Sequence, residues 1–444
     1  MDILEKMSRM LEEYPLCDHC LGRQFALLGH GIENDERGRA IKLALTLKAH
    51  ELALSKNREG VRILKILATN GFSKAAGEIL QKMKKHIPRK NFPKTCFLCE
   101  SKSESFDDLA KKALKELESY EYNSFLVGIE LPITVEERED EFKAKFNVSY
   151  GENMRNEFGR VIGKKIAEHS GKIADYRKPE IVVLVNPFAE KISLQINPLY
   201  IAGRYKKLVR GIPQSKWFCS NCQGKGCEKC NWTGKMYPES VEELIATPLL
   251  DVTSGIKASF HGSGREDIDA RMLGKGRPFV IEITKPQKRF FDLKKLKEII
   301  NTYAKGKAEV LNLQFADKAV VRRLKKAESA QKEYRVLIEF ENKIATKELR
   351  LLEERLTNVM VMQKTPIRVL HRRADLTREK YIYEVKVKKL SPKKAEMKIR
   401  SQGGLYVKEL VTGDEGRTTP SVSEILKNRA KPIKLDVLNV IMEG

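Results

Sequence analysis

The sequence lacks an apolar run long enough to cross a bilayer, and its first residues, MDILEKMSRMLEEYPLC, lack the basic, apolar and small-residue order of a signal peptide. It also lacks internal repeats and low-complexity tracts. We therefore expect a cytoplasmic protein with no membrane segment. With 444 residues, of which 41% are hydrophobic, the chain is long enough for two or three domains with sizeable cores.

The second half of the chain lacks the acidic residues that would balance its basic ones. Residues 1–200 hold 33 Lys and Arg against 30 Asp and Glu, whereas residues 201–444 hold 51 against 30. The formal net charge of +24 therefore comes almost entirely from the second half. A surplus confined to one half favours a bound polyanion over general solubility or a membrane surface. We predict nucleic acid as the partner.

No cysteine stands alone. A Cys-x-x-Cys pair lets two thiolates grip one ion from a tight turn, and two pairs complete a structural zinc site with four cysteine ligands. An iron–sulfur cluster also accepts four cysteines and stays an alternative. His19 lies inside the first pair, and we interpret it as a bystander because the cysteines already fill four positions. The four pairs are Cys17 and Cys20, Cys96 and Cys99, Cys219 and Cys222, and Cys227 and Cys230.

The spacing of the pairs predicts two zinc sites. The third and fourth pairs lie in CSNCQGKGCEKCNWTGK, so close together that they must share one site, a zinc knuckle over residues 219–230. The first and second pairs have 75 residues between them. Loop-closure entropy grows slowly with loop length, so a second zinc joining these pairs is also predicted.

Hydrophobic periodicity predicts both helices and strands. Expected helices cover residues 39–54, 61–85, 106–120, 152–171 and 239–250. Expected strands cover residues 124–132, 141–150, 179–187, 191–201 and 278–283, with an acidic turn, VEERED, between the first two. The charge balance shifts and the knuckle begins near residues 204–217, where we place a domain boundary.

The stretch HGSGREDIDARMLGKGRPFVIEI, residues 261–283, crowds acids and arginines just before an apolar strand. GSGRED superficially resembles a dinucleotide-binding loop, but the third glycine is absent. A surface turn with solvated charges is the plainer alternative. Against it, Arg265 lies two residues from Asp267. An arginine beside an aspartate keeps the carboxylate ionised and oriented, as a nucleophile or general base requires.

Three long motifs give the chain a resemblance to a known family. GREDIDARMLGKGRPFVIEI, QKTPIRVLHRRADLTR and QGGLYVKELVTGDEGRTTPS resemble, in order and spacing, the tenth family of archaeal and eukaryotic tRNA pseudouridine synthases, which modifies T-loop uridines. The similarity covers residues 204–444. Less sharply, the first two cysteine pairs and the strands before RYKKLVRGIPQ are similar to that family's zinc-containing THUMP domain.

The resemblance implies an α+β fold. Residues 205–444 would form a pseudouridine synthase catalytic domain with a mixed, mostly antiparallel sheet and the knuckle at 219–230. Residues 1–204 would form an N-terminal accessory domain. Its zinc-binding helical part would cover about 1–105, and its THUMP-like α/β part about 106–204.

The resemblance also implies catalytic roles. Asp267 matches the nucleophile, which attacks a flipped-out nucleoside so that the uracil detaches, rotates and rejoins through carbon. Arg265 would pair with that carboxylate. Tyr334 matches the tyrosine that stacks on the base, although an ordinary strand tyrosine is the alternative. Lys408 would be a charged partner near Asp267.

Further residues would bind the substrate. Val407 and Leu435 match apolar walls of the family's pocket, which Tyr334 and Lys408 also line. Four residues of RVLHRR, together with the lysines of KVKKLSPKK, are candidates for gripping RNA phosphates rather than reading bases. A solvated hairpin turn is the alternative for the lysine run. The four residues are Arg368, His371, Arg372 and Arg373.

The resemblance implies a tRNA pseudouridine synthase that acts on T-loop uridine 54, uridine 55 or both, with tRNA as its partner, and we expect a monomer. No cofactor is expected for catalysis, because the isomerisation is redox-neutral. Another THUMP-linked tRNA enzyme is disfavoured, since the chain lacks both a glycine-rich cofactor loop after a strand and an SGGxDS-type ATP motif. A non-catalytic tRNA binder or chaperone of the same fold would have to treat Asp267, Tyr334 and Lys408 as relics.

Overall fold

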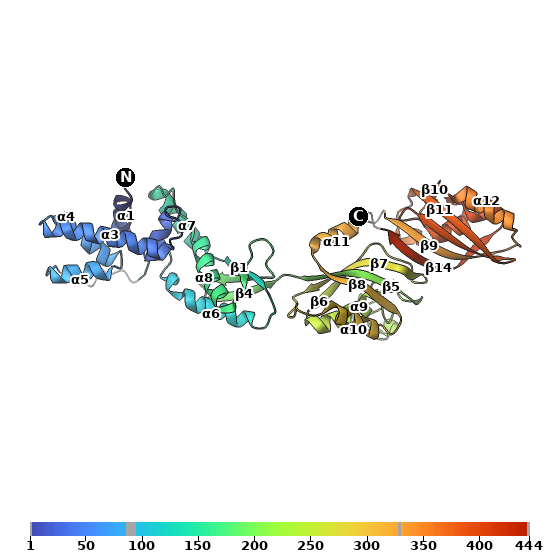
Figure 1. Cartoon of the computed structure of the whole chain (residues 1–444), viewed down its shortest axis with the longest axis horizontal. Coiled ribbons are helices and arrows are strands. Elements are labelled where there is room, and N and C mark those ends of the chain that lie inside the picture. Colours follow the sequence, from blue (N-terminus) through green and yellow to red (C-terminus); the bar gives the residue numbers. More distant parts are fainter. Residues whose placement is uncertain (1, 86–94, 327–329, 442–444) are drawn as a thin grey trace. The chain divides into compact units, whose positions relative to one another are not determined.

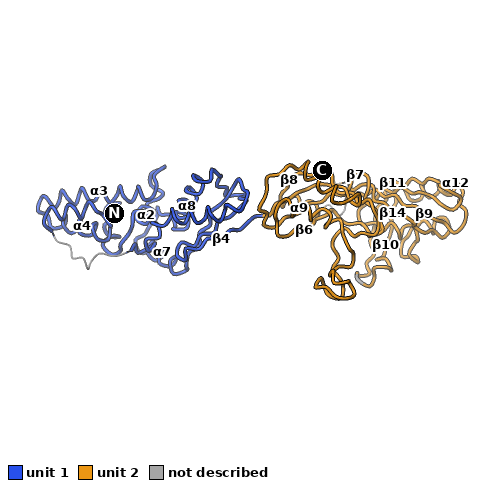
Figure 2. Tube along the Cα trace, turned by 90° about the horizontal axis from the view of Figure 1, so that it is seen from below, with its two compact units in different colours: residues 1–197 blue, residues 198–444 orange. Residues whose placement is uncertain are grey.

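The structure, a computed structural model, describes residues 2–85, 95–326 and 330–441, apart from the side chain of Arg372. The chain divides into two compact units, residues 1–197 and 198–444 (Figure 2). We predicted a boundary near residue 204. The division falls earlier because β5 (Leu199–Lys207), which we expected to continue the strand before it, belongs to the sheet of the second unit.

The first unit begins with helices. They are α1 (Ile3–Glu13), α2 (Asp18–Gly22), α3 (Asn34–Leu54), α4 (Arg58–Thr69), α5 (Lys74–Lys82), α6 (Phe106–Leu117), α7 (Ile133–Lys145) and α8 (Met154–Ser170), with short 3₁₀ turns at Arg23–Phe25 and Lys102–Ser105. The predicted helices at 39–54, 106–120 and 152–171 are confirmed. The predicted helix at 61–85 is wrong as one element, because Ser73 caps a second helix and accepts a hydrogen bond from the Ala76 amide.

A four-stranded sheet completes this unit. Its order is β2 (Ile173–Ala174), β1 (Ser124–Ile129), β3 (Ile181–Asn186) and β4 (Lys191–Ile196). β1 runs parallel to both β2 and β3, whereas β3 and β4 form an antiparallel hairpin. Helices α6 and α8 pack against the sheet (Figure 1).

The predicted strand at 141–150 is wrong. Residues 133–145 form helix α7, whose buried side chains are Val135, Glu139 and Phe142. Those positions are spaced by about one helical turn, so they share one face. The acidic turn that we expected between two strands is therefore the first part of a helix.

The second unit contains a ten-stranded sheet. Nine strands follow the order β13 (Thr418–Thr419), β10 (Val359–Lys364), β11 (Thr377–Ser391), β12 (Lys394–Ser401), β9 (Gln331–Phe340), β14 (Ala430–Ile441), β7 (Arg271–Thr284), β5 and β8 (Ala308–Ala316), and β6 (Lys257–Gly262) pairs with β7. Among the described strands, β14 and β7 run parallel and the other neighbours are antiparallel. The predicted mixed, mostly antiparallel sheet is confirmed.

Helices cover both faces of one half of this sheet. Figure 1 shows α9 (Val241–Thr253) and α10 (Leu293–Tyr303) on one side of β5, β7 and β8, and α11 (Lys318–Lys326) on the other. Strand β7 contributes side chains to both faces of the sheet. Phe279 and Ile281 pack in the main core on one face, and Val280 packs under α11 on the other. Elsewhere lie α12 (Thr346–Leu356), α13 (Val407–Thr412), α14 (Val422–Leu426) and 3₁₀ turns at Glu228–Cys230, Ile367–Arg372 and Asp414–Gly416.

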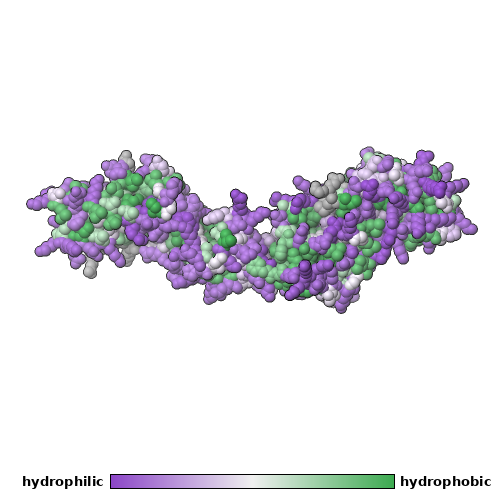
Figure 3. Space-filling model, viewed as in Figure 1, coloured by the Kyte–Doolittle hydropathy of each residue, from purple (hydrophilic) through white to green (hydrophobic). Residues whose placement is uncertain are grey.

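The lysine run KKLSPKK lies at the end of β11 and in its turn into β12, so the hairpin that we considered for it is present. Hydrophilic residues are spread over the visible face of both units (Figure 3). Among the described residues, the structure contains no helix long and apolar enough to span a membrane.

Candidate functional site

A cavity of about 220 Å³ opens in the second unit where the loop between β6 and β7 meets strands β9 and β14 and helix α13. Asp267 lies in that loop and lines the cavity. Its other lining residues come from distant parts of the chain, so the fold brings the predicted motifs together. They are Arg265, Glu266, Ala270, Arg277, Lys332, Tyr334, Arg368, Val369, Arg373, Gly404, Leu405, Tyr406, Val407, Lys408, Leu435 and Val437.

Two cations hold the Asp267 carboxylate. The Nζ atom of Lys408 lies 3.1 Å from Asp267 Oδ2, and Nη2 of Arg368 lies 3.5 Å from the same oxygen. Burial alone would raise the pKa of this carboxyl, but the charges of Lys408 and Arg368 outweigh burial and hold the pKa below its ordinary value. The carboxylate is therefore ionised at neutral pH and faces the cavity.

The structure gives Arg265 a different contact from the predicted one. Its guanidinium carbon lies 5.5 Å from the centroid of the Trp217 ring, a cation–π arrangement. Lys408 and Arg368 supply the ion pairs of Asp267 instead. The positive charge of Arg265 still contributes to lowering the pKa of Asp267, after Lys408 and Arg368. Arg265 and Asp267 nevertheless both line the cavity, as expected.

Tyr334 forms part of the cavity wall. Alternation along β9 places it on the same face as Val336 and Ile338, which are buried in the main core. Burial raises the pKa of Tyr334 to about 12; the charge of Arg277 lowers this pKa and that of Asp267 raises it. The phenol therefore keeps its proton and presents a neutral ring. Val407 and Leu435, the two predicted apolar walls, also line the cavity and are buried.

A buried polar network beneath Asp267 was missed by the sequence reasoning. Glu266 accepts hydrogen bonds from Arg277 Nε at 2.9 Å and from the Tyr205 hydroxyl at 2.9 and 3.1 Å. The Lys207 ammonium donates to the carbonyl oxygens of Ile212, Asp267 and Ile268 at 2.9, 3.0 and 3.2 Å. The backbone of Asp267 is thus tied directly to strand β5.

A sequence signal for this network did exist. Ile201, Tyr205 and Lys207 share the alternation of one strand, and the first two belong to the apolar core. A lysine on such a face is buried, and because a buried charge without hydrogen-bond partners is very costly, this position predicts a polar network around it. Burial lowers the pKa of Lys207, whereas the nearby Glu266 carboxylate favours its charged form.

The basic residues of RVLHRR divide into distinct environments. Arg368 donates a hydrogen bond from Nε to Glu409 Oε1 at 2.7 Å, and it also forms an ion pair with Asp267. Arg373 donates from Nη1 to the Tyr406 hydroxyl at 3.0 Å. His371 is exposed. The side chain of Arg372 lies outside the described residues.

The cysteines form the two predicted groups. Cys17, Cys20, Cys96 and Cys99 gather in one, and Cys219, Cys222, Cys227 and Cys230 in the other, with the four sulfurs of each group within 4.8 Å of one another. Individual separations are 3.7 Å for Cys17 and Cys99 and 3.9 Å for Cys219 and Cys227. Four sulfurs placed tetrahedrally at ~2.3 Å from a zinc ion stand ~3.8 Å apart, so both groups fit that ion.

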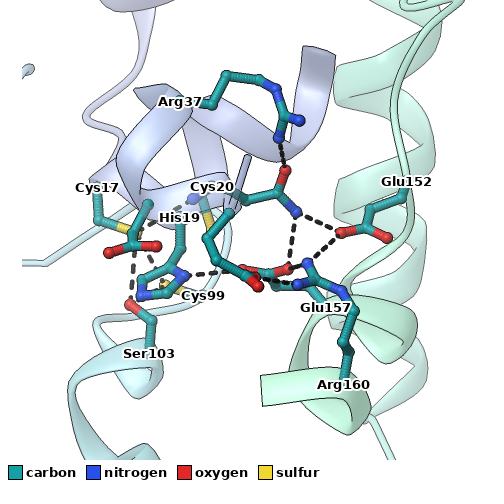
Figure 4. A network of polar contacts seen from close by, with 12 residues as sticks. Cys17, His19, Cys20, Arg37, Cys99, Ser103, Glu152, Glu157 and Arg160 are labelled. Carbon is teal, nitrogen blue, oxygen red and sulfur yellow. Dashed lines mark hydrogen bonds and ion pairs between the residues drawn. The ribbon is translucent and has the colours of Figure 1, made fainter. Parts of the chain in front are cut away.

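His19 lies beside the first group but is not among its possible metal ligands. Its Nδ1 atom lies 2.8 Å from Glu157 Oε1, and Glu157 also pairs with Arg160 (Figure 4). The hydroxyl of Ser103 lies 3.5 Å from the Cys17 sulfur, on the other side of the imidazole (Figure 4). The interpretation of His19 as a bystander agrees with this geometry.

Comparison with known proteins finds relatives that match nearly the whole chain. The family model described as Pus10, C-terminal, matches residues 200–441, and the model described as Pus10 THUMP domain, archaeal, matches residues 109–186. A protein from Methanocaldococcus jannaschii named tRNA pseudouridine synthase Pus10 is 46% identical over 443 residues, covering 97% of this chain and 93% of that protein. Proteins of the same name from Methanothrix thermoacetophila and Pyrococcus furiosus are 40% and 38% identical, covering 99% of this chain and 94% and 98% of theirs.

The predicted resemblance is confirmed in both halves of the chain, because each family model matches one of them and the named relatives match nearly from end to end. The three motifs that suggested it all lie within residues 200–441. The chain belongs to the Pus10 family of tRNA pseudouridine synthases, with an archaeal-type THUMP domain in its N-terminal half.

Proposed function

We propose that this protein converts uridine to pseudouridine in the T-loop of tRNA, at position 54, position 55 or both, with Asp267 as the nucleophile. The observation that carries the proposal is the ionised Asp267 carboxylate, held by Lys408 at the wall of a cavity that also contains Tyr334. A nucleophile must be deprotonated and must face the space that the substrate enters. Asp267 meets both conditions.

The cavity also suits a base taken out of folded RNA. A uridine inside a stacked loop is out of reach, so the enzyme must extrude it, at a cost of roughly a few kcal/mol. Tyr334 offers an aromatic face for stacking, and Val407 and Leu435 offer apolar walls. Asp267 would then attack the nucleoside, and the detached uracil would rotate between these walls and rejoin through carbon.

Arg265 and Lys408 would act on the charge of the site rather than on the base. Lys408 keeps Asp267 ionised, and Arg265, which also lines the cavity, adds positive potential. His371 and Arg373, with Arg372 beside them in the chain, are proposed phosphate contacts because they follow Arg368 in one basic stretch. Arg368 itself contacts Asp267, which makes it a less available phosphate ligand than the sequence suggested.

The two cysteine groups would hold zinc ions with a structural role. Each offers four thiolates and leaves no open coordination position for chemistry. The first group would join α2 to the segment before α6, and the second would close the knuckle. The isomerisation exchanges one glycosidic bond for another and needs no cofactor. We take the protein to act in the cytoplasm as a monomer, with the THUMP domain holding the acceptor end of the tRNA.

The decisive experiment incubates the protein with an unmodified tRNA transcript and maps pseudouridines by position. Pseudouridine at position 54, at position 55 or at both supports the proposal and decides between the three possibilities. A protein that binds the transcript but forms no pseudouridine would be the non-catalytic tRNA binder.

A further inference from the structure

The zinc knuckle carries two large aromatic rings that bury little of their surface. Phe218 is 57% exposed and Trp232 is 73% exposed. Aromatic side chains usually stabilise a protein by burying their large apolar area. These two rings contribute little to the knuckle in that way, so a contact beyond the described residues would explain them better.

The backbone at Trp232 strengthens this argument. Its φ angle is +60°, and the φ of the preceding Asn231 is +48°. Asparagine tolerates this left-handed region, but a bulky residue is strained there. Glycine would relieve the strain at position 232. A strained, exposed tryptophan is the kind of residue that persists where its side chain meets a ligand.

Both rings lie against the loop between the two cysteine pairs. A Cβ atom built on Gly224 would lie 2.8 Å from Cδ1 of Phe218, and one on Gly226 would lie 3.5 Å from Cε3 of Trp232. The backbone of this loop therefore lies against both rings. The Nζ atom of Lys216 lies 5.1 Å from the Phe218 centroid. A ring that already packs against the backbone on one side has less conformational freedom to lose when a base stacks on its other side.

The base of the knuckle adjoins the Asp267 cavity. Trp217 precedes Phe218, and its ring contacts the guanidinium of Arg265, which lines the cavity. The Tyr237 ring meets Trp217 edge-on at 5.6 Å, and the Met236 amide donates to the Trp217 carbonyl at 3.0 Å. The base of the knuckle thus contacts the loop that carries Asp267, through the side chain of Arg265.

Charge alone does not select a partner for the knuckle. Residues 216–236 contain four lysines and one glutamate, a surplus of three positive charges. A zinc ion with four thiolates would contribute −2, which leaves the knuckle nearly neutral. Stacking, rather than attraction to phosphate, is therefore the interaction that these residues can supply. Every nucleobase has a face that can stack on an aromatic ring, whereas paired bases are already stacked.

We infer that Phe218 and Trp232 form a stacking site for unpaired bases of the RNA substrate that lie beside the target uridine. This inference rests on the proposed function, because it takes the substrate to be a folded tRNA with an exposed loop. It assigns to the knuckle a share of substrate binding in addition to its structural zinc.

Tryptophan fluorescence tests the contact directly. The chain has two tryptophans, so Trp217→Phe, which keeps a ring beneath Arg265, leaves Trp232 as the single reporter. Titration of this variant with an unmodified tRNA transcript should quench the fluorescence, because a stacked base quenches an indole. A fully paired RNA duplex of similar length serves as the matched probe without unpaired bases and should leave the signal nearly unchanged. Equal signals with both RNAs would overturn the inference.

Binding measurements give a second readout. Trp232→Ala should raise the Kd for the transcript about fivefold or more, Trp232→Leu should behave similarly, and Trp232→Phe should restore most of the affinity. Tyr303→Ala is the matched control, since Tyr303 is 48% exposed on α10. Equal zinc content in all variants would show that the knuckle is intact. Unchanged affinity in Trp232→Ala would refute the stacking site.

The two proposals fail in distinguishable ways. If the parent protein forms pseudouridine while the Trp232 variants bind and quench like their controls, the stacking site is refuted and the proposed function stands. If the transcript quenches Trp232 but the parent protein forms no pseudouridine, the stacking site stands and the proposed function is refuted.

Discussion

The ammonium of Lys408 lies 3.1 Å from Oδ2 of Asp267, which makes it the nearer of the two cations that hold this carboxylate. The same ammonium lies 2.8 Å from both carboxylate oxygens of Asp269. Lys408 is therefore shared between two aspartates of one loop. Only Asp267 of the two lines the cavity, and its side chain is less exposed than that of Asp269.

This difference predicts unequal effects of two matched substitutions. Asp267→Asn should abolish pseudouridine formation, because the amide is nearly isosteric but is no nucleophile. Its affinity for tRNA should change by less than roughly 1 kcal/mol at moderate salt, since phosphate contacts dominate binding. Asp269→Asn should leave measurable turnover. Pseudouridine mapping and filter binding on both variants check the prediction, and near-parental conversion by Asp267→Asn would contradict it.

Lys408 should control the pH dependence of the reaction. The lysine lowers the pKa of Asp267, so its loss should raise that pKa. The proposed nucleophile is the ionised carboxylate, so a higher pKa should move the acidic limb of kcat/KM to higher pH, by about 1–3 units for a close opposite charge. We expect this shift in Lys408→Met and not in Lys408→Arg. Identical acidic limbs in the parent and in Lys408→Met would rule out this electrostatic role.

The sequence allowed the site to be predicted where local rules apply. The Cys-x-x-Cys spacing predicted both groups of four cysteines, and the motif resemblance predicted Asp267 and Tyr334, which line one cavity. It failed where the partner is distant in the chain, as with Trp217, which lies 48 residues before Arg265. The helix α7 was missed because EFKAKF alternates like a strand, although Phe142 and Phe146 also fit one face of a helix.

Lys207 should act as a positioning residue for Asp267. Its buried ammonium holds the Asp267 and Ile268 carbonyls, and a displacement of about 1 Å at a nucleophile can cost on the order of 100-fold in rate. Lys207→Met should lower kcat by about that factor while KM changes little. The neighbouring Lys206 contacts Glu309 and serves as the control, because Lys206→Met leaves the loop contacts in place. A purely structural role would instead lower the fraction of folded enzyme without changing kcat per folded molecule.

The two metal groups should differ in how readily they release their ions. Elemental analysis should find two zincs per chain, and the absence of visible charge-transfer absorbance would exclude iron–sulfur clusters. Three cysteines of the first group are buried, whereas three of the knuckle group are only half-buried. A chelator should therefore remove the knuckle zinc first. Cys222→Ser and Cys20→Ser should each lower the zinc content by one, which identifies the fast phase.

Asp436 should stabilise the sheet around the cavity. Arg271 on β7 donates to its carboxylate from Nε at 2.9 Å, and Arg335 on β9 donates from Nη2 at 2.9 Å. Burial would raise the pKa of Asp436, but these arginines and Arg210 lower it to about 2. Asp436 lies between Leu435 and Val437 on β14, both of which line the cavity, so the ion pairs fasten three strands beside the site.

The sign of the pH effect follows from this lowered pKa. A depressed pKa contributes stability above the unfolded value of ~3.9, and this contribution is lost as the pH falls through about 2. Asp436→Asn should thus lower the free energy of unfolding at pH 7 by about 2 kcal/mol, as for a hydrogen bond to a charged group. The difference in free energy of unfolding between parent and variant should shrink as the pH falls from about 4 to about 2, because these values are the pKa of Asp436 in the unfolded and the folded protein. Denaturant titrations across this range measure that difference. Asp251→Asn, on an exposed position of α9, should show no such gap at either pH. A constant difference for Asp436→Asn across this range would mean that the side chain stabilises the strands through its shape and not through its charge.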